Sequence, residues 1–153
     1  MIDIVDNDTR SRMMAGIGGR NTRPERRLRA ALHARGLRFR IHAKELPGNP
    51  DVVLPRFRAA IFVHGCFWHR HPGCRYATMP ATRPEFWQEK FAKNVRRDAA
   101  AVTVLREMEW RVAIVWECAL RTAADVEVSV ATLSAWLHDC EDLLEIGSES
   151  ARL

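Results

Sequence analysis

The segment that decides the fold of this chain runs Asp51-Val-Val-Leu-Pro-Arg-Phe-Arg-Ala-Ala-Ile-Phe-Val-His64-Gly-Cys-Phe-Trp-His-Arg-His-Pro-Gly-Cys74. Its first half holds two β-rich runs, residues 51–55 and 60–64, joined by a turn near residues 56–58. If that turn closes an antiparallel hairpin, Asp51 lies opposite about Val63, and the start of one strand shares a site with the end of the other. The Val63 carbonyl and the His64 side chain then offer this site a hard oxygen ligand and a proton-transfer group.

The second half of the segment predicts a structural zinc site. Thiolates and imidazoles at this density suit tetrahedral zinc, and Cys66, His71 and Cys74 supply three ligands. Cys118 is the favoured fourth ligand, because it follows a predicted core strand that can neighbour residues 60–64. Cys140 is the alternative, although it follows a helix in an acidic tail, and four buried thiols without metal are a further alternative.

Aromatic and imidazole side chains inside this loop predict a second use for it. Phe67 and Trp68 stand between ligands and cannot easily all turn inward, so we expect the loop to present them to a partner. His69 and His71 flank Arg70. One of these histidines can bind zinc while the other faces a catalytic centre.

Length and charge indicate one domain, residues 1–153, with a polyanion as partner. The 153 residues are 47% hydrophobic, which suffices for one core. Residues 1–40 carry ten Arg and four acidic residues, whereas residues 122–153 carry one Arg and seven acidic residues. We read residues 1–20 as a basic N-terminal arm and residues 140–153 as an acidic tail, the least constrained part. The alternative is an ordinary solvated surface in an Arg-rich protein.

Targeting signals and membrane spans are absent from the sequence. No apolar run approaches the roughly 20 residues of a membrane span, and the first residues lack the basic and apolar regions of a signal peptide. We therefore expect a cytoplasmic protein without a membrane partner. Disulfides are disfavoured there, which supports the interpretation of the clustered cysteines as metal ligands.

The remaining elements predict a mixed α/β sandwich. Thr-Arg-Pro-Glu occurs at 22–25 and at 82–85, and each copy reads as a capping box that starts a helix. The first helix reaches about Arg35 with Gly36 as its stop, and two further helices span about 84–108 and 125–138. Besides the hairpin, residues 38–42 and 110–116 read as strands.

Asp98 is the strongest carboxylate candidate outside the hairpin. It falls on the same helical stripe as Phe91, Val95, Val102 and Leu105, and a charge on a buried face is costly unless it is paired or functional. We favour function over a buried ion pair with an arginine. Glu25, by contrast, is explained by its place in the first capping box, and a second role stays open.

Several separated motifs, taken together, closely resemble the Vsr very-short-patch mismatch-repair endonucleases. The resemblance covers about residues 8–121. Its motifs are Thr9-Arg-Ser-x-Met-Met, Asp51, His64-Gly-Cys-Phe-Trp-His69, Pro80-Ala-Thr-Arg-x-Glu-Phe-Trp87, Lys93-Asn-Val-x-Arg-Asp98 and Trp110-Arg-Val-x-Ile-Val-Trp-Glu-Cys-Ala-Leu-Arg121.

The resemblance implies a fold, an activity and partners. It implies a restriction-endonuclease-like mixed sheet flanked by helices. It implies a Mg²⁺-dependent enzyme that nicks one strand of duplex DNA 5′ of the mispaired T at T:G mismatches, which arise from deaminated 5-methylcytosine, and so starts very short patch repair. The implied setting is a monomer in the bacterial cytoplasm, associated with the nucleoid when bound to DNA, with functional links to mismatch-repair proteins and a cytosine methyltransferase.

The resemblance also implies residue roles. Asp51 and the Val63 carbonyl would bind Mg²⁺, although Val63 stands where the family often has Thr. His69 with Asp98 would position or deprotonate water and assist the leaving group, supported by His64 and Glu25. The zinc ligands would be Cys66, His71, Cys74 and Cys118. The residues implied to enter the base stack are Phe67, Trp68 and Trp87 from the major groove and Met14, on the basic arm, from the minor groove.

Two other functions remain as alternatives. One is a non-catalytic, zinc-stabilised protein that binds distorted or mismatched DNA, which would need none of Asp51, His64, His69 and Asp98. The other is an ordinary restriction enzyme, which would act as a dimer on paired sites. Trp87 also has a structural alternative: it lies one turn before Phe91 and can simply begin the core stripe of its helix.

Overall fold

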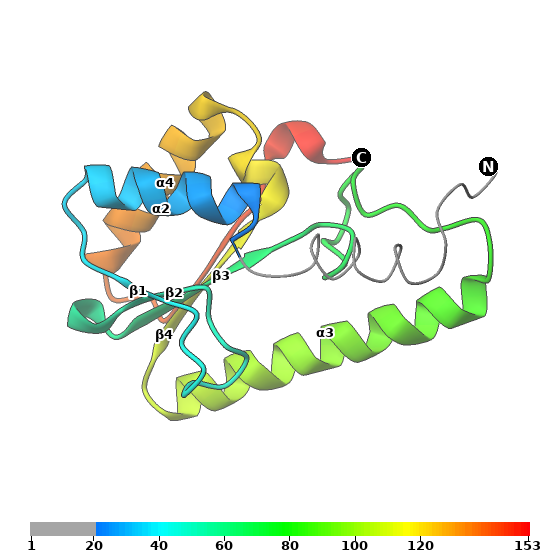
Figure 1. The fold of residues 1–153 in the computed structure, drawn as a ribbon, viewed down its shortest axis with the longest axis horizontal. Helices are drawn as coiled ribbons and strands as arrows, with labels where there is room; N and C mark the ends of the chain where they lie inside the picture. The colour runs from blue at the N-terminus through cyan, green and yellow to red at the C-terminus, as the bar shows by residue number, and fades with distance from the viewer. Residues whose placement is uncertain (1–20) are drawn as a thin grey trace.

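In the computed structural model of this chain, residues 21–153 are described. A five-stranded sheet in the order β1-β2-β3-β4-β5 separates helices α2 and α4 on one face from helix α3 on the other (Figure 1). The mixed α/β class is thereby confirmed. The basic arm and Met14 lie outside the described residues.

Residues 21–153 form three α-helices and five strands, with short 3₁₀ helices between them. They are α2 (Arg23–Ala34), β1 (Arg40–Ile41), β2 (Val52–Leu54), η1 (Pro55–Phe57), β3 (Ala59–His64), α3 (Pro84–Glu107), β4 (Arg111–Trp116), η2 (Glu117–Leu120), α4 (Ala123–Leu137), β5 (Leu143–Ile146) and η3 (Glu149–Ala151).

The predicted hairpin is confirmed, with a register shifted by one residue. β1, β2 and β3 pair antiparallel, whereas β3, β4 and β5 pair parallel. Val52 lies opposite Ile61, a register that continues to Asp51 opposite Phe62 rather than Val63. The Asp51 carboxylate nevertheless reaches the end of β3, because Val63 N–H donates to its Oδ2 at 2.7 Å.

Alternation along β3 decides which side chains face which helices. Ala59 and Ile61 pack into the core shared with α2 and α4, whereas Ala60 and Phe62 pack into the core shared with α3. Since successive strand residues point to opposite faces, His64 lies on the α3 side of the sheet. The last side chain of β3 therefore faces the same side of the sheet as α3.

The two Thr-Arg-Pro-Glu copies behave differently. In the first, Thr22 Oγ1 accepts from Glu25 N–H at 3.4 Å and Glu25 Oε2 accepts from Asn21 N–H at 3.2 Å. For the second copy the predicted capping box was wrong. Arg83 is the N-cap, at φ 55 and without a side-chain cap, and α3 begins at Pro84. Because the left-handed residue comes directly before the helix, Thr82 lies too early to cap it.

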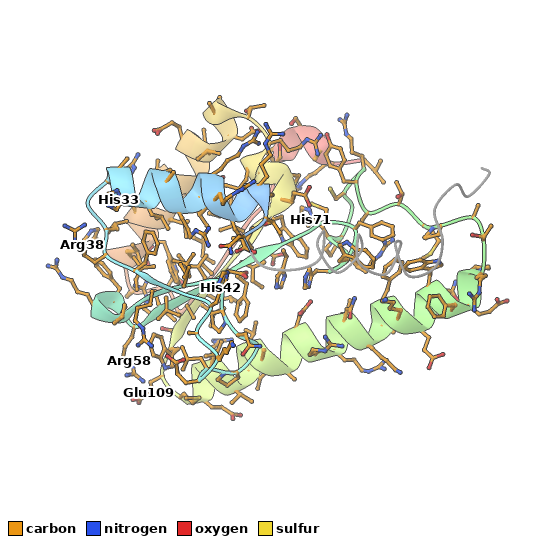
Figure 2. The ribbon with its side chains drawn as sticks, viewed as in Figure 1. His33, Arg38, His42, Arg58, His71 and Glu109 are labelled. Carbon is orange, nitrogen blue, oxygen red and sulfur yellow. The ribbon has the colours of Figure 1, made fainter. Side chains whose placement is uncertain are left out.

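Helix α3 is longer than the sheet that it covers (Figure 1). Phe91 and Leu105 are buried, but Val95 is 45% exposed. The predicted stripe was therefore wrong at Val95, because this half of the helix extends past the end of the sheet. At the other end, Arg58 donates to the carbonyls of Met108 and Glu109 and so ties the turn after α3 to the hairpin (Figure 2).

The expectation of a weakly constrained tail was wrong. β5 pairs parallel with β4, and Leu144 and Ile146 pack into the α2–α4 core. The residues after β5 also pair with the loop that follows β3, through an isolated bridge between Cys74 and Arg152. Strand β5 was not predicted from the sequence, because acidic residues surround the apolar residues of this strand at the edge of the sheet.

Candidate active site and metal cluster

A cleft of about 730 Å³ lies where the parallel strands β3 and β4 end. Crevices at the carboxyl ends of parallel strands are the usual ligand sites of α/β sheets. The start of α2, the end of β3, the loop after it and one position of α3 form its walls. Among the lining residues are Glu25, Asp51, His64, His69 and Asp98.

Asp51 carries an unfavourable charge in this cleft. Burial raises the pKa of its carboxyl to about 7, and the nearby Glu25 charge adds to the rise. The hydrogen bond from Val63 N–H opposes the rise but does not cancel it. A carboxylate of this kind gains most from a cation placed beside it.

Glu25 is brought into the cleft beside Asp51, which the capping-box interpretation did not require. Glu25 is only 3% exposed, and its Oε2 lies 3.2 Å from His42 Nε2. Ligand atoms of Glu25, His42 and Asp51 all lie within 4.8 Å of one another. Sequence reasoning missed His42, which belongs to no motif. Its only signal was its place at the end of a predicted strand.

His69 and Asp98 meet across the cleft. His69 Nδ1 lies 2.6 Å from Asp98 Oδ2, and His69 stacks on His64 with ring centroids 4.0 Å apart. Burial, together with the smaller effect of the neighbouring His69, lowers the pKa of His64 to about 3, so His64 is neutral at physiological pH. Asn94 Nδ2 donates to the Trp68 carbonyl at 3.1 Å and ties the loop to α3.

Four side chains in and near the loop could hold one metal ion. Ligand atoms of Cys66, His71, Cys74 and Cys118 lie within 4.8 Å of one another. His71 Nδ1 is 3.7 Å from Cys66 Sγ and 3.5 Å from Cys118 Sγ. Cys140 is exposed and lies outside this cluster. The geometry therefore favours Cys118 over Cys140 as the fourth ligand.

The residues after β5 close over this Cys/His cluster. Ser148 N–H donates to Cys118 Sγ at 3.3 Å, and Leu153 N–H donates to the Gly73 carbonyl at 2.9 Å. A Cβ at Gly147 would lie 2.7 Å from His71 Cε1, so only glycine fits there without displacing the ring. In Figure 2, His71 lies between α2 and α3. Nothing in the sequence linked this segment to the loop.

An aromatic cluster lies at the edge of the cleft and consists of the half-buried Phe67 and Trp68 of the loop and Trp87 of α3. Phe67 and Trp68 meet edge to face at 5.0 Å, and Trp68 lies 5.9 Å from Trp87. Phe67 also contacts the buried Phe91 at 5.2 Å. These residues are thus less projecting than expected, and Trp87 is neither fully buried nor fully exposed. Lys90 Nζ lies 5.5 Å from the Trp68 ring.

Comparisons with known proteins place the chain in a family. A family model described as DNA mismatch endonuclease Vsr matches residues 2–75. The DNA mismatch endonuclease Vsr of Escherichia coli (strain K12) is 51% identical over 121 residues, which cover 79% of this chain and 77% of that protein. The chain belongs to the Vsr family.

Other Vsr relatives are named as nicking enzymes. The type II nicking enzyme V.XorIIP of Xanthomonas oryzae pv. oryzae is 43% identical over 127 residues, 83% of this chain and 93% of that protein. The type II nicking enzyme V.NmeAIP of Neisseria meningitidis is 38% identical over 124 residues, 81% of this chain and 88% of that protein.

The Vsr family model spans only part of the site. Its matched residues include Asp51, the loop from His64 to Cys74 and Glu25, whereas Asp98 and Cys118 lie beyond residue 75. Those two residues join the site through the fold, on α3 and after β4. Among residues 21–153, no helix is long and apolar enough to span a membrane.

Proposed function

We propose that this chain is an endonuclease that nicks duplex DNA on the 5′ side of the mispaired T at T:G mismatches, using Mg²⁺, and thereby starts very short patch repair. One observation carries the proposal: a half-buried carboxylate, Asp51, and a His69–Asp98 pair line the same cleft, with the aromatic cluster at its edge. Binding of DNA alone needs no such set. The names of the relatives, a mismatch endonuclease and nicking enzymes, support the same activity.

Asp51 and the Val63 carbonyl are the residues proposed to hold the catalytic cation. The high pKa of the Asp51 carboxyl supports this, because a dication offsets the cost of burying its charge. Mg²⁺ prefers oxygen ligands and keeps several waters, which suits one carboxylate and one carbonyl in an open cleft. When bound, it would polarise the scissile phosphate and acidify water.

His69 is proposed to move the proton. Its Nδ1 faces Asp98 Oδ2 at 2.6 Å, so Asp98 holds the tautomer in which Nδ1 carries hydrogen and Nε2 accepts. Nε2 can then take a proton from the attacking water, and only the imidazolium formed by protonation of Nε2 can give a proton to the leaving oxygen. His64, neutral and stacked on the ring, adds no competing positive charge and supports the orientation of His69.

Mismatch recognition is proposed to use Phe67, Trp68 and Trp87. A mismatch is cheaper to unstack than a regular pair, so a wedge of aromatic rings selects for it energetically. The half-buried rings brace one another, which limits the side-chain entropy lost on entering DNA. Lys90 beside two of the rings and the cleft-lining Arg23 and Arg26 supply charge for the phosphates. Met14, proposed for the minor groove, lies outside the described residues.

The Cys/His cluster is proposed to hold structural Zn²⁺. Ligands of a tetrahedral zinc, with Zn–S near 2.3 Å and Zn–N near 2.0 Å, lie about 3.5–3.8 Å apart. His71 Nδ1 lies 3.5 Å from Cys118 Sγ and 3.7 Å from Cys66 Sγ, and these separations support the proposal. Zinc would favour the thiolate forms of Cys66 and Cys118, whose pKa values burial otherwise raises. It would also stiffen the loop that carries His69 and Trp68.

The proposed cellular role follows from the proposed substrate. T:G mismatches from deaminated 5-methylcytosine imply functional links to a cytosine methyltransferase and to mismatch-repair proteins. The enzyme would act as a monomer, since one mismatch offers one strand to cut, and would work in the bacterial cytoplasm at the nucleoid.

A nicking assay tests the proposal. Duplexes of one sequence carrying T:G, T:A or C:G at one position, each labelled on either strand, are incubated with the protein and Mg²⁺, with Asp51→Ala as control. We expect a single nick 5′ of the T, only in T:G duplex, and none with Asp51→Ala. T:G binding without a nick would favour the non-catalytic DNA-binding alternative. Cutting of both strands of paired duplex would favour an ordinary restriction enzyme.

A further inference from the structure

His42 adjoins two carboxylates of the cleft, those of Glu25 and Asp51, and has no role in the proposed chemistry. Its N–H donates to the Asp51 carbonyl at 3.2 Å, and its Nε2 lies 3.2 Å from Glu25 Oε2. Its backbone is left-handed, at φ 50, a conformation in which most residues with a Cβ are disfavoured and His, Asn and Asp are enriched. The side chain is 13% exposed, and in Figure 2 it lies between α2 and α3.

Glu25 is held through one of its two oxygens. Oε2 accepts from Asn21 N–H at 3.2 Å, faces His42 Nε2 at 3.2 Å and lies 3.7 Å from Arg29 Nη1. Within residues 21–153 no hydrogen bond to Oε1 is found, and Oε1 is not among the buried unpaired atoms. Because Glu25 lines the cleft, the contacts of Oε2 orient a carboxylate that borders the position beside Asp51.

We propose that His42 is a positioning residue for the divalent-cation site of the cleft, acting through Glu25. It fixes the rotation of the Glu25 carboxylate so that one oxygen stays beside Asp51, and its main chain fixes Asp51 through the backbone hydrogen bond. Ligand atoms of the three residues lie within 4.8 Å, so a small rotation of Glu25 would change the charge that a cation at Asp51 meets. The inference rests on the proposed function, since it assumes that Asp51 binds the cation.

Two substitutions separate the side-chain contact from the backbone conformation. His42→Asn tolerates a positive φ, but its side chain is too short to place an amide nitrogen at the Nε2 position. His42→Gln can place an amide donor near that position. Outer hydrogen-bond partners of metal-ligating carboxylates typically change metal affinity by about 10- to 100-fold when they are lost. We therefore expect metal affinity to fall when the side chain at position 42 is too short to contact Glu25, as in His42→Asn, and to be kept when it is long enough, as in His42→Gln.

The experiment measures Mn²⁺ binding by electron paramagnetic resonance and the Mg²⁺ dependence of nicking in the same variants. We expect His42→Asn to raise the Mn²⁺ dissociation constant and the half-saturating Mg²⁺ concentration by about 10-fold. His42→Gln should stay within about threefold of the unsubstituted protein, since the contact is kept. T:G affinity without divalent cation should change little in both variants, and the melting temperature should change little in His42→Asn, whose side chain tolerates φ 50. Should His42→Asn not fold, His42→Gly, which adopts φ 50 freely, replaces it.

Four outcomes would overturn the inference. Unchanged Mn²⁺ affinity in His42→Asn would show that Glu25 needs no positioning. Equal losses in the Asn and Gln variants, together with a fall in melting temperature, would make His42 purely structural. Loss of Mn²⁺ binding in Asp51→Asn but not in Glu25→Gln would exclude Glu25 and leave the proposed function standing. If Asp51→Asn keeps full Mn²⁺ binding, the proposed cation site itself fails, and the inference with it.

Discussion

His69 Nδ1 and Asp98 Oδ2 lie 2.6 Å apart although 29 residues separate them in the chain. The loop after β3 carries one partner and helix α3 the other. The carboxylate fixes the imidazole in one orientation and tautomer, which is what a proton-transferring histidine needs. Because the Cys/His cluster includes neighbours of His69 in the same loop, a metal ion bound there would restrain the backbone that positions this pair.

The pair predicts graded losses of catalysis. His69→Ala should lower the single-turnover nicking rate by roughly 10²–10⁴-fold, since it removes the proton acceptor. Asp98→Asn should cost less, about 10- to 100-fold, because the imidazole stays but its tautomer is no longer imposed. The measurement is single-turnover cleavage of T:G duplex at saturating enzyme, with duplex affinity in the absence of divalent cation as control. An unchanged rate in His69→Ala would make that histidine structural.

The raised pKa of Asp51 predicts a pH-dependent effect on stability. The folded carboxyl has a pKa of about 7, against an ordinary value of 3.8, so the folded state favours the proton. The stability that this carboxyl contributes is present below about pH 4 and is lost as pH rises through 7. Without added divalent cation, Asp51→Asn should therefore melt several degrees higher than the unsubstituted protein at pH 8. At pH 4 the two proteins should have the same melting temperature.

A cation should reverse this difference. Mg²⁺ added at pH 8 should raise the melting temperature of the unsubstituted protein and leave that of Asp51→Asn unchanged, since only the carboxylate binds the ion. Thermal denaturation at both pH values, with and without Mg²⁺, checks the expectation. A lower melting temperature of Asp51→Asn at pH 8 without cation would contradict it.

Cys118 and Cys140 give a matched pair of substitutions at the Cys/His cluster. Protein purified without added metal should contain one zinc per chain by elemental analysis. Cys118→Ser should lose the zinc and much of the folding stability, because structural zinc binding is coupled to folding. Cys140→Ser should keep both, since this thiol is exposed and remote from the cluster. The reverse pattern would show that the tail supplies the fourth ligand.

Gly147 predicts that the segment after β5 holds metal in place. Ala at this position would put its Cβ 2.7 Å from His71 Cε1, and the ring has little room to retreat because it stacks on Trp116 at 4.3 Å. We expect Gly147→Ala to release zinc to a colorimetric chelator about 10-fold faster. Ser148→Ala is the control, since the N–H donated to Cys118 is kept. Equal release rates in the two variants would refute the role of Gly147.

Substitution of Trp68 distinguishes a residue that inserts into DNA from a residue that only stabilises the core. Stacking on a base is worth roughly 1–3 kcal/mol per aromatic residue, so Trp68→Ala should weaken binding to T:G duplex by about one to two powers of ten. Its melting temperature should fall only slightly, because the ring is half-buried. Trp136→Ala is the matched comparison: this ring is 2% exposed in the α2–α4 core and should cost roughly 3–5 kcal/mol of stability. A large loss of stability with unchanged affinity in Trp68→Ala would exclude the wedge.

Local patterns determined most of the elements from the sequence alone. Thr22, Pro24 and Gly36 set the ends of α2, and alternating apolar residues set β3 and β4, because caps and side-chain periodicity act over a few residues. The spacing of Cys66, His71 and Cys74 likewise predicted a metal loop. The closeness of this loop to Cys118 depends on the parallel pairing of β3 with β4. The apolar character of residues 110–116 made that pairing plausible from the sequence.

Only the tertiary structure decided which distant side chains share the cleft. From the sequence Glu25 is interpreted only as a helix cap, whereas the fold brings the start of α2 to His42 and Asp51. The acidic residues around 143–146 obscured β5, whose pairing with β4 then carries Gly147 and Ser148 onto the Cys/His cluster. Such contacts join segments far apart in the chain, and their geometry comes from the packing of whole elements. The residues adjacent to a side chain in the sequence therefore do not indicate which distant residues it contacts.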